Sequence, residues 1–135
     1  MKASQLSNRL DFAEAEPWVA EGDTIVTQFA GRPASQGTAA GRCRIVSSVE
    51  DLSTIEKDTI LFFDHASPVL SMVMPRLAGL VTRHGGPLAI AAGYARLYGI
   101  PAVVGVGNFM DSVRDGDYVL VDGSAGRVDV LRGPA

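Results

Sequence analysis

Residues 82–104 read TRHGGPLAIAAGYARLYGIPAVV and place a turn, a helix and a strand in immediate succession. Gly85-Gly86 forms the turn, Pro87 opens a predicted helix that runs to about Tyr98, and Gly99-Ile100-Pro101 ends it. Residues 102–104 are a short apolar strand, and residues 79–82 are another strand before the turn. A strand, a helix and a second strand predict the crossover unit of a parallel sheet.

The flanking sequence repeats this alternation. Residues 42–47 and 59–63 predict strands, and the second is almost wholly apolar, as expected when both faces of a sheet are covered. Residues 49–55 predict one or two helical turns, and Ser67-Pro68 predicts a helix start. Residues 118–121 and 127–130 predict a C-terminal hairpin. The fold class is therefore α/β, with a largely parallel central sheet and a C-terminal hairpin.

Two segments near the N-terminus differ from this pattern. Residues 31–41, GRPASQGTAAG, are rich in small residues and turn formers and predict a loop. Residues 1–30 are interpreted as an N-terminal arm that packs on its own domain or on a partner. The predicted division is an arm at 1–30 and one domain at 31–135.

Composition narrows the classes of partner. Hydrophobic residues make up 47% of the 135 residues and the net charge is −3, which argues against nucleic acid or an anionic membrane. No apolar run approaches the roughly 20 residues that span a bilayer, and the first residues have no apolar signal region. We expect a cytoplasmic protein. The single cysteine, Cys43, lies between two arginines in a predicted strand and is either a small core residue or an activated thiol.

The turn between the strand and the helix is a candidate anion site. Glycines let a ligand approach the backbone, and the unpaired N–H groups of a helix N-terminus favour an anion. Thr82, His84, Gly85 and Gly86 are the candidate ligand-binding residues in this turn. A purely structural turn is the alternative interpretation.

The wider sequence resembles the mobile, swivelling domain of the phosphoenolpyruvate-utilising enzymes, which include phosphoenolpyruvate synthase, pyruvate phosphate dikinase and enzyme I of the sugar phosphotransferase system. The family signature, in words Thr-x-x-Gly-Gly-x-x-x-His-Ala-Ala-Ile-x-Ala-Arg and then Gly-Ile-Pro-Ala-Val-Val-Gly, resembles residues 82–105. Further matching positions are Gly31, Ala34, Ser35, Gly37, Ala39, Gly41, Asp64, Pro68, Val121, Asp122, Gly123, Gly126 and Val128. The resemblance implies a swivelling β/β/α phosphohistidine-type domain over residues 31–130.

The family resemblance also implies a mechanism and partners. In such enzymes a histidine of this domain carries a phosphoryl group between an ATP-grasp nucleotide-binding domain and a barrel that binds pyruvate or phosphoenolpyruvate. The domain itself binds no cofactor. The phosphoryl group, derived from phosphoenolpyruvate or ATP, arrives through those partners, which a chain of this length must meet in trans.

This chain departs from the family at the residue that carries the phosphoryl group. Four residues beyond Gly86, the carrier position holds Ile90, and isoleucine accepts no phosphoryl group. The family's later isoleucine is replaced by Gly93, which disfavours a helix. Ile90, Tyr94 and Leu97 or Tyr98 form a second apolar stripe on this helix, so this region is either repacked or a new docking surface.

Only two histidines are able to substitute. His84 is an alternative phosphoacceptor, a phosphate contact or a loop histidine bonded to backbone. His65 is the weaker candidate, because the side chain of neighbouring Asp64 is expected to point away from it. Arg96, which matches the family's motif arginine, binds phosphate or a partner carboxylate, or ties the helix to the domain by a salt bridge.

Three hypotheses remain open on sequence alone. The first is a carrier subunit, like that of the split phenylphosphate synthase, that uses His84 or His65. The second is a pseudo-carrier that keeps the fold and docking surfaces and transfers nothing. The third is a different enzyme on the same scaffold, like the swivelling domains of aconitase-like dehydratases. Ile90 and Gly93 favour the second, a binding or regulatory subunit.

Overall fold

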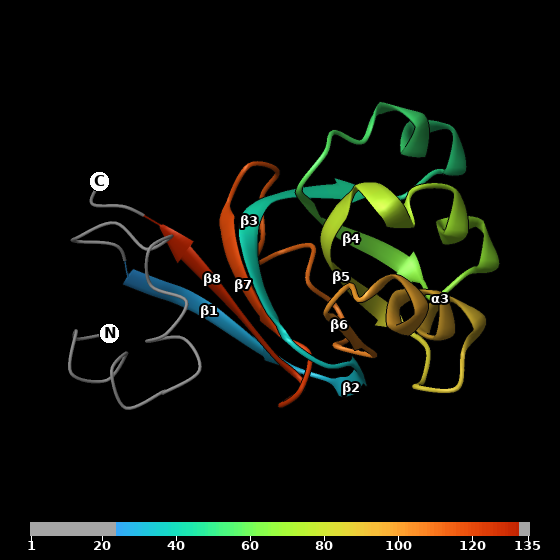
Figure 1. The fold of residues 1–135 in the computed structure, drawn as a ribbon. Helices are drawn as coiled ribbons and strands as arrows, with labels where there is room; N and C mark the ends of the chain where they lie inside the picture. Colours follow the sequence, from blue (N-terminus) through green and yellow to red (C-terminus); the bar gives the residue numbers. More distant parts are fainter. Residues whose placement is uncertain (1–23, 133–135) are drawn as a thin grey trace.

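Four parallel strands form the centre of the molecule (Figure 1). The computed structural model describes residues 24–132. Its elements are β1 (Thr24–Ala30), β2 (Arg32–Ser35), β3 (Thr38–Val46), η2 (Val49–Thr54), β4 (Thr59–His65), η3 (Pro68–Met72), η4 (Met74–Arg76), β5 (Leu77–His84), α3 (Ile90–Tyr98), β6 (Ala102–Val104), β7 (Tyr118–Asp122) and β8 (Arg127–Arg132).

The central strands confirm the predicted α/β class. Strands β3, β4, β5 and β6 pair in parallel in that order. Residues 60–63 of β4 are buried without alternation, because both faces of the sheet are covered. Each crossover between these strands contains helical turns, as the alternating sequence pattern predicts.

A single bent segment joins the two ends of the sheet. The strand order is β1-β8-β7-β3-β4-β5-β6-β2, so β1 and β2 stand at opposite ends although only Gly31 separates them in sequence. A methyl group at Gly31 would lie 2.6 Å from the carbonyl oxygen of Val104. Glycine is therefore required where the chain bends from one end of the sheet to the other.

The prediction of a loop over residues 31–41 is wrong. Arg32–Ser35 pairs antiparallel with β6, and β3 begins at Thr38 and pairs antiparallel with β7. Small residues and glycines resemble a loop in sequence, but here they let the backbones of distant segments approach closely. The last residues of the expected arm, Thr24–Ala30, pair with β8. The rest of that arm, residues 1–23, lies outside the described residues.

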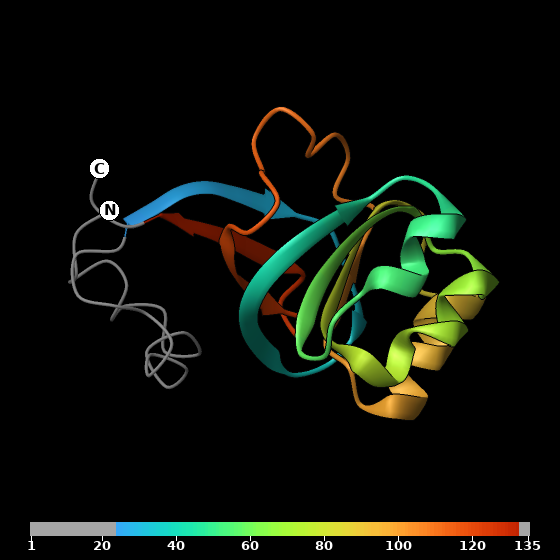
Figure 2. The ribbon, with the colours of Figure 1, turned by 90° about the horizontal axis from the view of Figure 1, so that it is seen from above.

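The two largest hydrophobic clusters of the described residues separate three layers, as the β/β/α expectation requires. Figure 2 shows η2, η3, η4 and α3 on one side of the central sheet, with β1, β7 and β8 curling away on the other. The helical side encloses a core that includes Leu61, Leu80 and the inward alanines of α3. The other core includes Phe62, whose ring packs edge-on against that of Phe109, with the ring centroids 5.0 Å apart.

The predicted C-terminal hairpin is confirmed, and its turn packs against the β1–β2 bend. Strands β7 and β8 pair antiparallel. A methyl group at Gly123 would lie 1.8 Å from the carbonyl oxygen of Ser35, and one at Gly126 would lie 2.6 Å from that of Gly31. Asp122 closes the turn, because its Oδ1 accepts hydrogen bonds from the N–H groups of Ser124 and Ala125 at 3.0 and 2.9 Å.

The helices differ in extent from the prediction. Ser67 caps the backbone N–H of Val69 at 3.3 Å as expected, but the segment forms two short 3-10 turns, since Pro75 cannot continue a helix. Helix α3 begins at Ile90 rather than Pro87. It ends as predicted at Gly99, which has φ +69° and donates its N–H to the carbonyls of Ala95 and Arg96.

Candidate functional site

The two histidines lie side by side at the carboxyl ends of neighbouring strands. Strands β4 and β5 end in register at His65 and His84. Their rings are stacked, with centroids 5.3 Å apart and planes inclined by 26°. Ligands of open α/β sheets bind outside this edge. Sequence reasoning named both histidines as candidates but did not bring them into contact with each other.

The expectation that the side chains of Asp64 and His65 point apart is wrong. The Asp64 Oδ2 atom lies 3.0 Å from Nε2 of His65, and its Oδ1 atom lies 3.7 Å from a guanidinium nitrogen of Arg83. Because β4 ends at His65, these side chains lie at the terminus of a strand rather than in its interior. The side chain of His65 remains 66% exposed.

Two of the four candidate turn residues have structural roles. Thr82 is fully buried, and its hydroxyl donates a 2.8 Å hydrogen bond to the carbonyl of His84, so it is shielded from a ligand. Gly85 has φ +118°, and a methyl group there would lie 2.8 Å from Cβ of Ala66. The turn therefore needs glycine at 85 for its conformation and its packing.

The surroundings of Gly86 are open and carry a positive charge that the sequence did not indicate. The Nη1 atom of Arg32 lies 3.9 Å from the position that a methyl group at Gly86 would take. Arg32 belongs to β2, the strand predicted as a loop, so sequence reasoning had no basis for placing it here. The guanidinium and the open backbone are suited to an anion.

Ile90, which the family resemblance places at the carrier position, is the first residue of α3. Ala89 is the N-cap and makes no side-chain hydrogen bond, and the N–H of Gly93 donates to the carbonyl of Ala89 at 3.2 Å. Ile90 follows with 58% of its surface exposed. A side chain at this position reaches solvent at the positive end of the helix, yet isoleucine has no lone pair with which to attack phosphorus.

The alternative that this region is repacked holds for one residue and not for the other. Tyr94 is partly buried and packs against the core beneath α3. Ile90 is exposed, as is Leu97 at 75%. The side chain of Ile90 therefore fills no internal space.

Arg96 ties α3 to two segments by way of backbone carbonyls rather than a salt bridge. Its Nη1 atom donates to the carbonyl of Ala34 at 2.8 Å and to that of Pro87 at 3.0 Å. The first bond anchors the helix to β2, and the second holds the turn that leads into α3. Arg96 thus positions the segment around Ile90.

The segment after β6 also braces the edge and was missed by sequence reasoning. The N–H groups of Val106 and Gly107 donate to the carbonyls of Thr82 and Arg83, both at 3.1 Å. Gly105 has φ +70°, and a methyl group there would lie 3.0 Å from the carbonyl oxygen of Gly85. The repeated glycine in Gly105-Val106-Gly107 was the available signal for this close approach.

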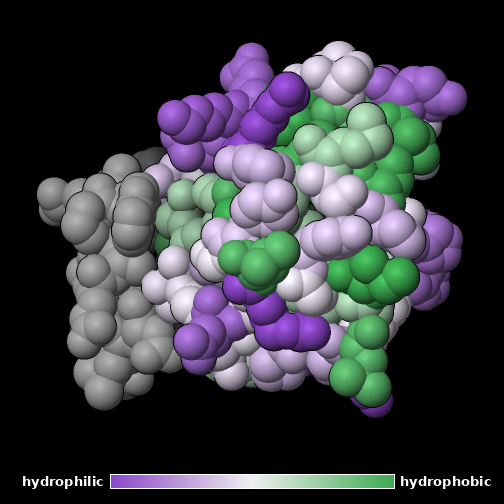
Figure 3. Space-filling model, turned by 45° about the vertical axis from the view of Figure 1, so that its right-hand side comes forward, coloured by the Kyte–Doolittle hydropathy of each residue, from purple (hydrophilic) through white to green (hydrophobic). Residues whose placement is uncertain are grey.

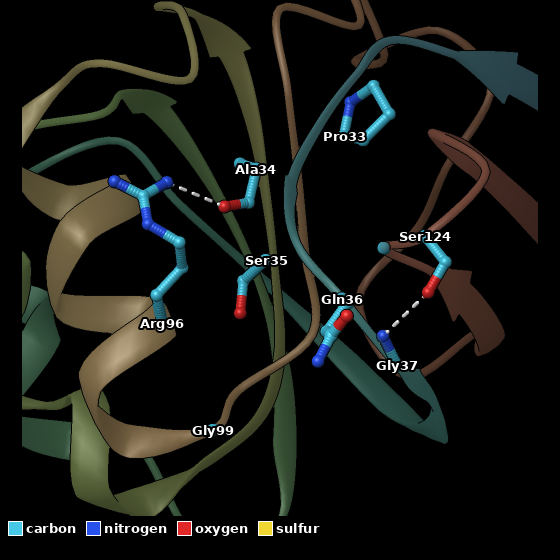
Figure 4. Close-up of a pocket in the computed structure, with 9 residues that line it drawn as sticks. Pro33, Ala34, Ser35, Gln36, Gly37, Arg96, Gly99 and Ser124 are labelled. Carbon is cyan, nitrogen blue, oxygen red and sulfur yellow. Dashed lines mark hydrogen bonds between the residues drawn. The ribbon is translucent and has the colours of Figure 1, made fainter.

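A separate hollow lies near the other end of α3. It has a volume of about 820 Å³ and is lined by Arg96, Gly99, the 33–37 segment and the hairpin turn. Figure 4 shows Arg96 bonded to Ala34 on one side and Ser124 bonded to the N–H of Gly37 on the other. The hollow lies over the junction of β2, β3 and the hairpin and does not contain Ile90 or either histidine.

Cys43 is a core residue. It is 4% exposed, and burial, reinforced by Asp117 and Asp115, raises the pKa of its thiol from 9.0 to about 12. The alternative of an activated thiol is wrong, because burial outweighs the flanking arginines. Within residues 24–132, no three His, Cys, Asp or Glu side chains are placed to hold a metal ion, and no helix is long and apolar enough to cross a membrane.

Comparison with known proteins links this geometry to one family. The model of the PEP-utilising enzyme mobile domain matches residues 55–126. A phosphoenolpyruvate synthase of Aeropyrum pernix is 39% identical over 127 residues, which are 90% of this chain and 15% of that protein. A rifampicin phosphotransferase of Bacillus cereus is 38% identical over 101 residues, which are 75% of this chain and 12% of that protein.

A solved structure agrees with these relatives. The solution structure of an Enzyme I protein superposes with a TM-score of 0.52 and 35% sequence identity, over 59% of this chain and 33% of that one. This chain spans only about an eighth to a seventh of the length of the phosphoenolpyruvate synthase and the rifampicin phosphotransferase that it matches.

Proposed function

The chain belongs to the family of PEP-utilising enzyme mobile domains, and we propose that this member docks on phosphotransferase modules without carrying a phosphoryl group. The observation that carries the proposal is Ile90. It occupies the first turn of α3 at the family's carrier position, is 58% exposed and has no nucleophilic atom. Such a domain would act as a binding or regulatory unit.

The surroundings of Ile90 support docking. Arg96 fixes the turn before α3 through the carbonyl of Pro87, and Gly105 lets the next loop pack on Gly85. The guanidinium of Arg32 stands beside Gly86. These contacts hold the turn and the start of α3 where a member of the family would present its phosphohistidine. The histidine itself is absent from this position.

The partners follow from the family. An ATP-grasp module that binds nucleotide and a module that binds phosphoenolpyruvate or pyruvate are the surfaces on which such a domain would dock. The phosphoryl group would come from ATP or phosphoenolpyruvate at those modules. A carrier histidine forms an N–P bond as the P–O bond to the leaving group breaks, and Ile90 offers no atom for that step.

The test supplies a phosphoryl donor and reads the mass of the intact chain. The chain, Ile90→His, His84→Ala and His65→Ala are each incubated with phosphoenolpyruvate or ATP and a phosphoenolpyruvate synthase that lacks its own mobile domain. We expect an acid-labile phosphoryl adduct on Ile90→His alone. An adduct on the unsubstituted chain would overturn the pseudo-carrier assignment. The absence of an adduct on Ile90→His would overturn docking on these modules.

A second candidate function is phosphoryl transfer through the stacked histidines. The observation that favours it is the 3.0 Å contact between Asp64 and His65. If Nε2 of His65 donates its proton in a hydrogen bond to Asp64, Nδ1 of His65 keeps a lone pair. The ring of His84 is stacked on the ring of His65.

The same incubation distinguishes this candidate from the first. An adduct that disappears in His65→Ala or in His84→Ala identifies the histidine that accepts the group. Asp64→Asn should then slow its formation, because the amide does not stabilise the imidazolium that forms.

A further inference from the structure

The hollow over the junction of β2, β3 and the hairpin turn has the size of a small-molecule site. Its volume of about 820 Å³ lies within the roughly 300–1,000 Å³ that such sites occupy. Its walls come from three parts of the chain, namely the 33–37 segment, the end of α3 and the hairpin turn. The proposed function does not use this hollow, because neither Ile90 nor a histidine lines it.

The lining is polar rather than apolar. Of the described residues that line the hollow, only Pro33 and Ala34 have apolar side chains, and the others are Ser35, Gln36, Gly37, Arg96, Gly99, Gly123 and Ser124. The apolar surface of α3 is elsewhere, since Ile90, Gly93 and Leu97 form an outward face opposite its buried alanines. Figure 3 faces this side of the molecule, where apolar and neutral surface occupies much of the middle and right. The hollow is therefore suited to a polar ligand.

Ser35 offers the hollow a hydroxyl that has no partner. The residue is only 4% exposed, and it lines the hollow. Within residues 24–132, no hydrogen bond joins this hydroxyl to another group. Figure 4 shows the side chain on the side of β2 that faces Arg96 and Gly99. A nearly buried hydroxyl without a hydrogen bond is unfavourable, and a ligand that bonds to it would remove that penalty.

Arg96 gives the same part of the hollow a positive charge. Its Nη1 atom is bonded to the carbonyls of Ala34 and Pro87, but carbonyls do not neutralise a guanidinium. Among the described residues, no carboxylate pairs with Arg96, and no hydrogen bond occupies its Nε and Nη2 atoms. Because Ser35 directly follows Ala34, the guanidinium and the free hydroxyl lie close together (Figure 4). Both groups donate hydrogen bonds, so together they suit a carboxylate.

The other walls limit the charge of the ligand and favour a donor on it. Gly99 is the C-cap of α3, where the helix dipole is negative. A phosphate ester, with a charge of about −1.5 to −2, would exceed the single positive charge of the lining. A carboxylate would match that charge. An amino or hydroxyl group of the ligand would be favoured beside Gly99, because the last carbonyls of a helix accept hydrogen bonds.

We propose that this hollow binds a small organic acid that has one carboxylate and a hydroxyl or amino group. The carboxylate would lie at Arg96 and Ser35, and the hydroxyl or amino group would lie toward Gly99. The Oγ atom of Ser124 accepts from the N–H of Gly37 at 2.9 Å, so its own proton is available to the ligand on the opposite wall. The proposal concerns the hollow alone and does not rest on the proposed function.

An NMR titration of the isotope-labelled full 135-residue chain tests the proposal, with β-hydroxybutyrate and L-threonine as probes. We expect saturable shifts of the backbone amide signals of Gln36, Gly37 and Ser124, with a Kd below about 10 mM for at least one probe. Three matched compounds define the ligand class. Butyrate lacks the hydroxyl group, β-hydroxybutyramide lacks the charge, and inorganic phosphate has a second charge.

Each of these three compounds should bind at least about fivefold more weakly than the better probe. Equal affinity for any of them would overturn the assigned ligand class. The absence of saturable shifts with both β-hydroxybutyrate and L-threonine would overturn the site itself and leave water as the occupant of the hollow.

Two substitutions test the residues that carry the argument. Ser35→Ala removes the unpartnered hydroxyl, and Arg96→Gln removes the charge while keeping an amide donor. Each should raise the Kd of the better probe at least about fivefold. Ser35→Ala should leave the midpoint of urea unfolding unchanged or raise it, because the hydroxyl that it removes has no partner within the described residues. Parent affinity in Ser35→Ala would overturn the proposal.

The matched controls are Ser53→Ala and Arg76→Gln. The hydroxyl of Ser53 donates to the carbonyl of Glu50, and the guanidinium of Arg76 donates to that of Ile55. Neither residue lines the hollow, so both variants should keep the Kd of the parent chain. Equal weakening in a control and in its matched variant would show that binding does not depend on the hollow, and would overturn the proposal.

Discussion

The junction between the β1–β2 bend and the hairpin turn uses its glycines differently from the outward face of α3. At the junction, Gly31, Gly123 and Gly126 each hold backbone against backbone, and a methyl group on any of them would lie within 3 Å of a carbonyl oxygen. On α3, Gly93 touches nothing that a methyl group would disturb. Both regions resemble the family in sequence, but only the first is fixed by the chain's own packing.

The comparison shows which face of α3 the fold depends on. The inward face of α3 consists of Ala91, Ala92 and Ala95, which are all fully buried. Ile90 and Gly93 lie outward, where substitution leaves the core untouched. A substitution on the outward face therefore changes the chemical groups that α3 offers without removing the domain.

The largest expected effect is at the junction. Gly123→Ala places a methyl group 1.8 Å from the carbonyl oxygen of Ser35 and 2.9 Å from the amide nitrogen of Ala102, and neither backbone atom moves without breaking strand pairing. We expect a loss of at least about 4 kcal/mol in the free energy of unfolding, measured by urea titration. A stability within 1 kcal/mol of the parent chain, as a rough threshold, would show that the junction is not rigid.

Asp122 tests the same turn by removing hydrogen bonds instead of adding bulk. Asp122→Ala leaves the N–H groups of Ser124 and Ala125 without their acceptor at a side chain that is 1% exposed. We expect a loss of about 2–3 kcal/mol in the same titration. Asp122→Asn keeps an oxygen acceptor and should lose less. An equal loss in both variants would assign the effect to charge rather than to the turn.

The buried thiol of Cys43 makes the free energy of unfolding depend on pH. Burial first, and then Asp117 and Asp115, raises the pKa of its thiol from 9.0 to about 12. As pH rises, the thiol loses its proton in the unfolded chain before it does so in the folded chain. The contribution of the buried thiol to the free energy of unfolding is therefore complete below pH 9 and is lost as pH rises toward 12. Between pH 9 and about 10.5 we expect a loss of about 2 kcal/mol, beyond the loss seen in Cys43→Ala. Identical pH profiles would contradict this.

The smallest effect has the opposite sign. Gly93→Ala removes a helix-disfavouring residue and introduces no clash, so it should raise the free energy of unfolding by about 0.5–1 kcal/mol. It is the matched partner of Gly123→Ala, because both are glycine-to-alanine changes, one where a methyl group would clash and one where it would not. The same urea titration measures this change. Destabilisation would mean that Gly93 serves the fold after all.

Much of the fold could be predicted because its signals are local. The apolar run of β4, the helix that ends at Gly99 and the hairpin around Asp122 are each encoded within a few adjacent residues. The segment 31–41 was wrong because a strand of small residues has no local signal. Its strand character comes from pairing with β6 and β7, which lie far along the chain.

The sequence alone determined the alternation of strands and helical turns from about residue 42 onward, the family resemblance, and the isoleucine at the position where that resemblance expects a histidine, because each depends on residue type and spacing. The tertiary structure alone decided which side chains meet. It stacked His65 on His84, turned Asp64 toward His65, brought Arg32 beside Gly86 and bound Arg96 to two carbonyls. These contacts join segments that are distant in sequence, or depend on how a strand ends, and backbone pairing fixes them only once the whole sheet has formed.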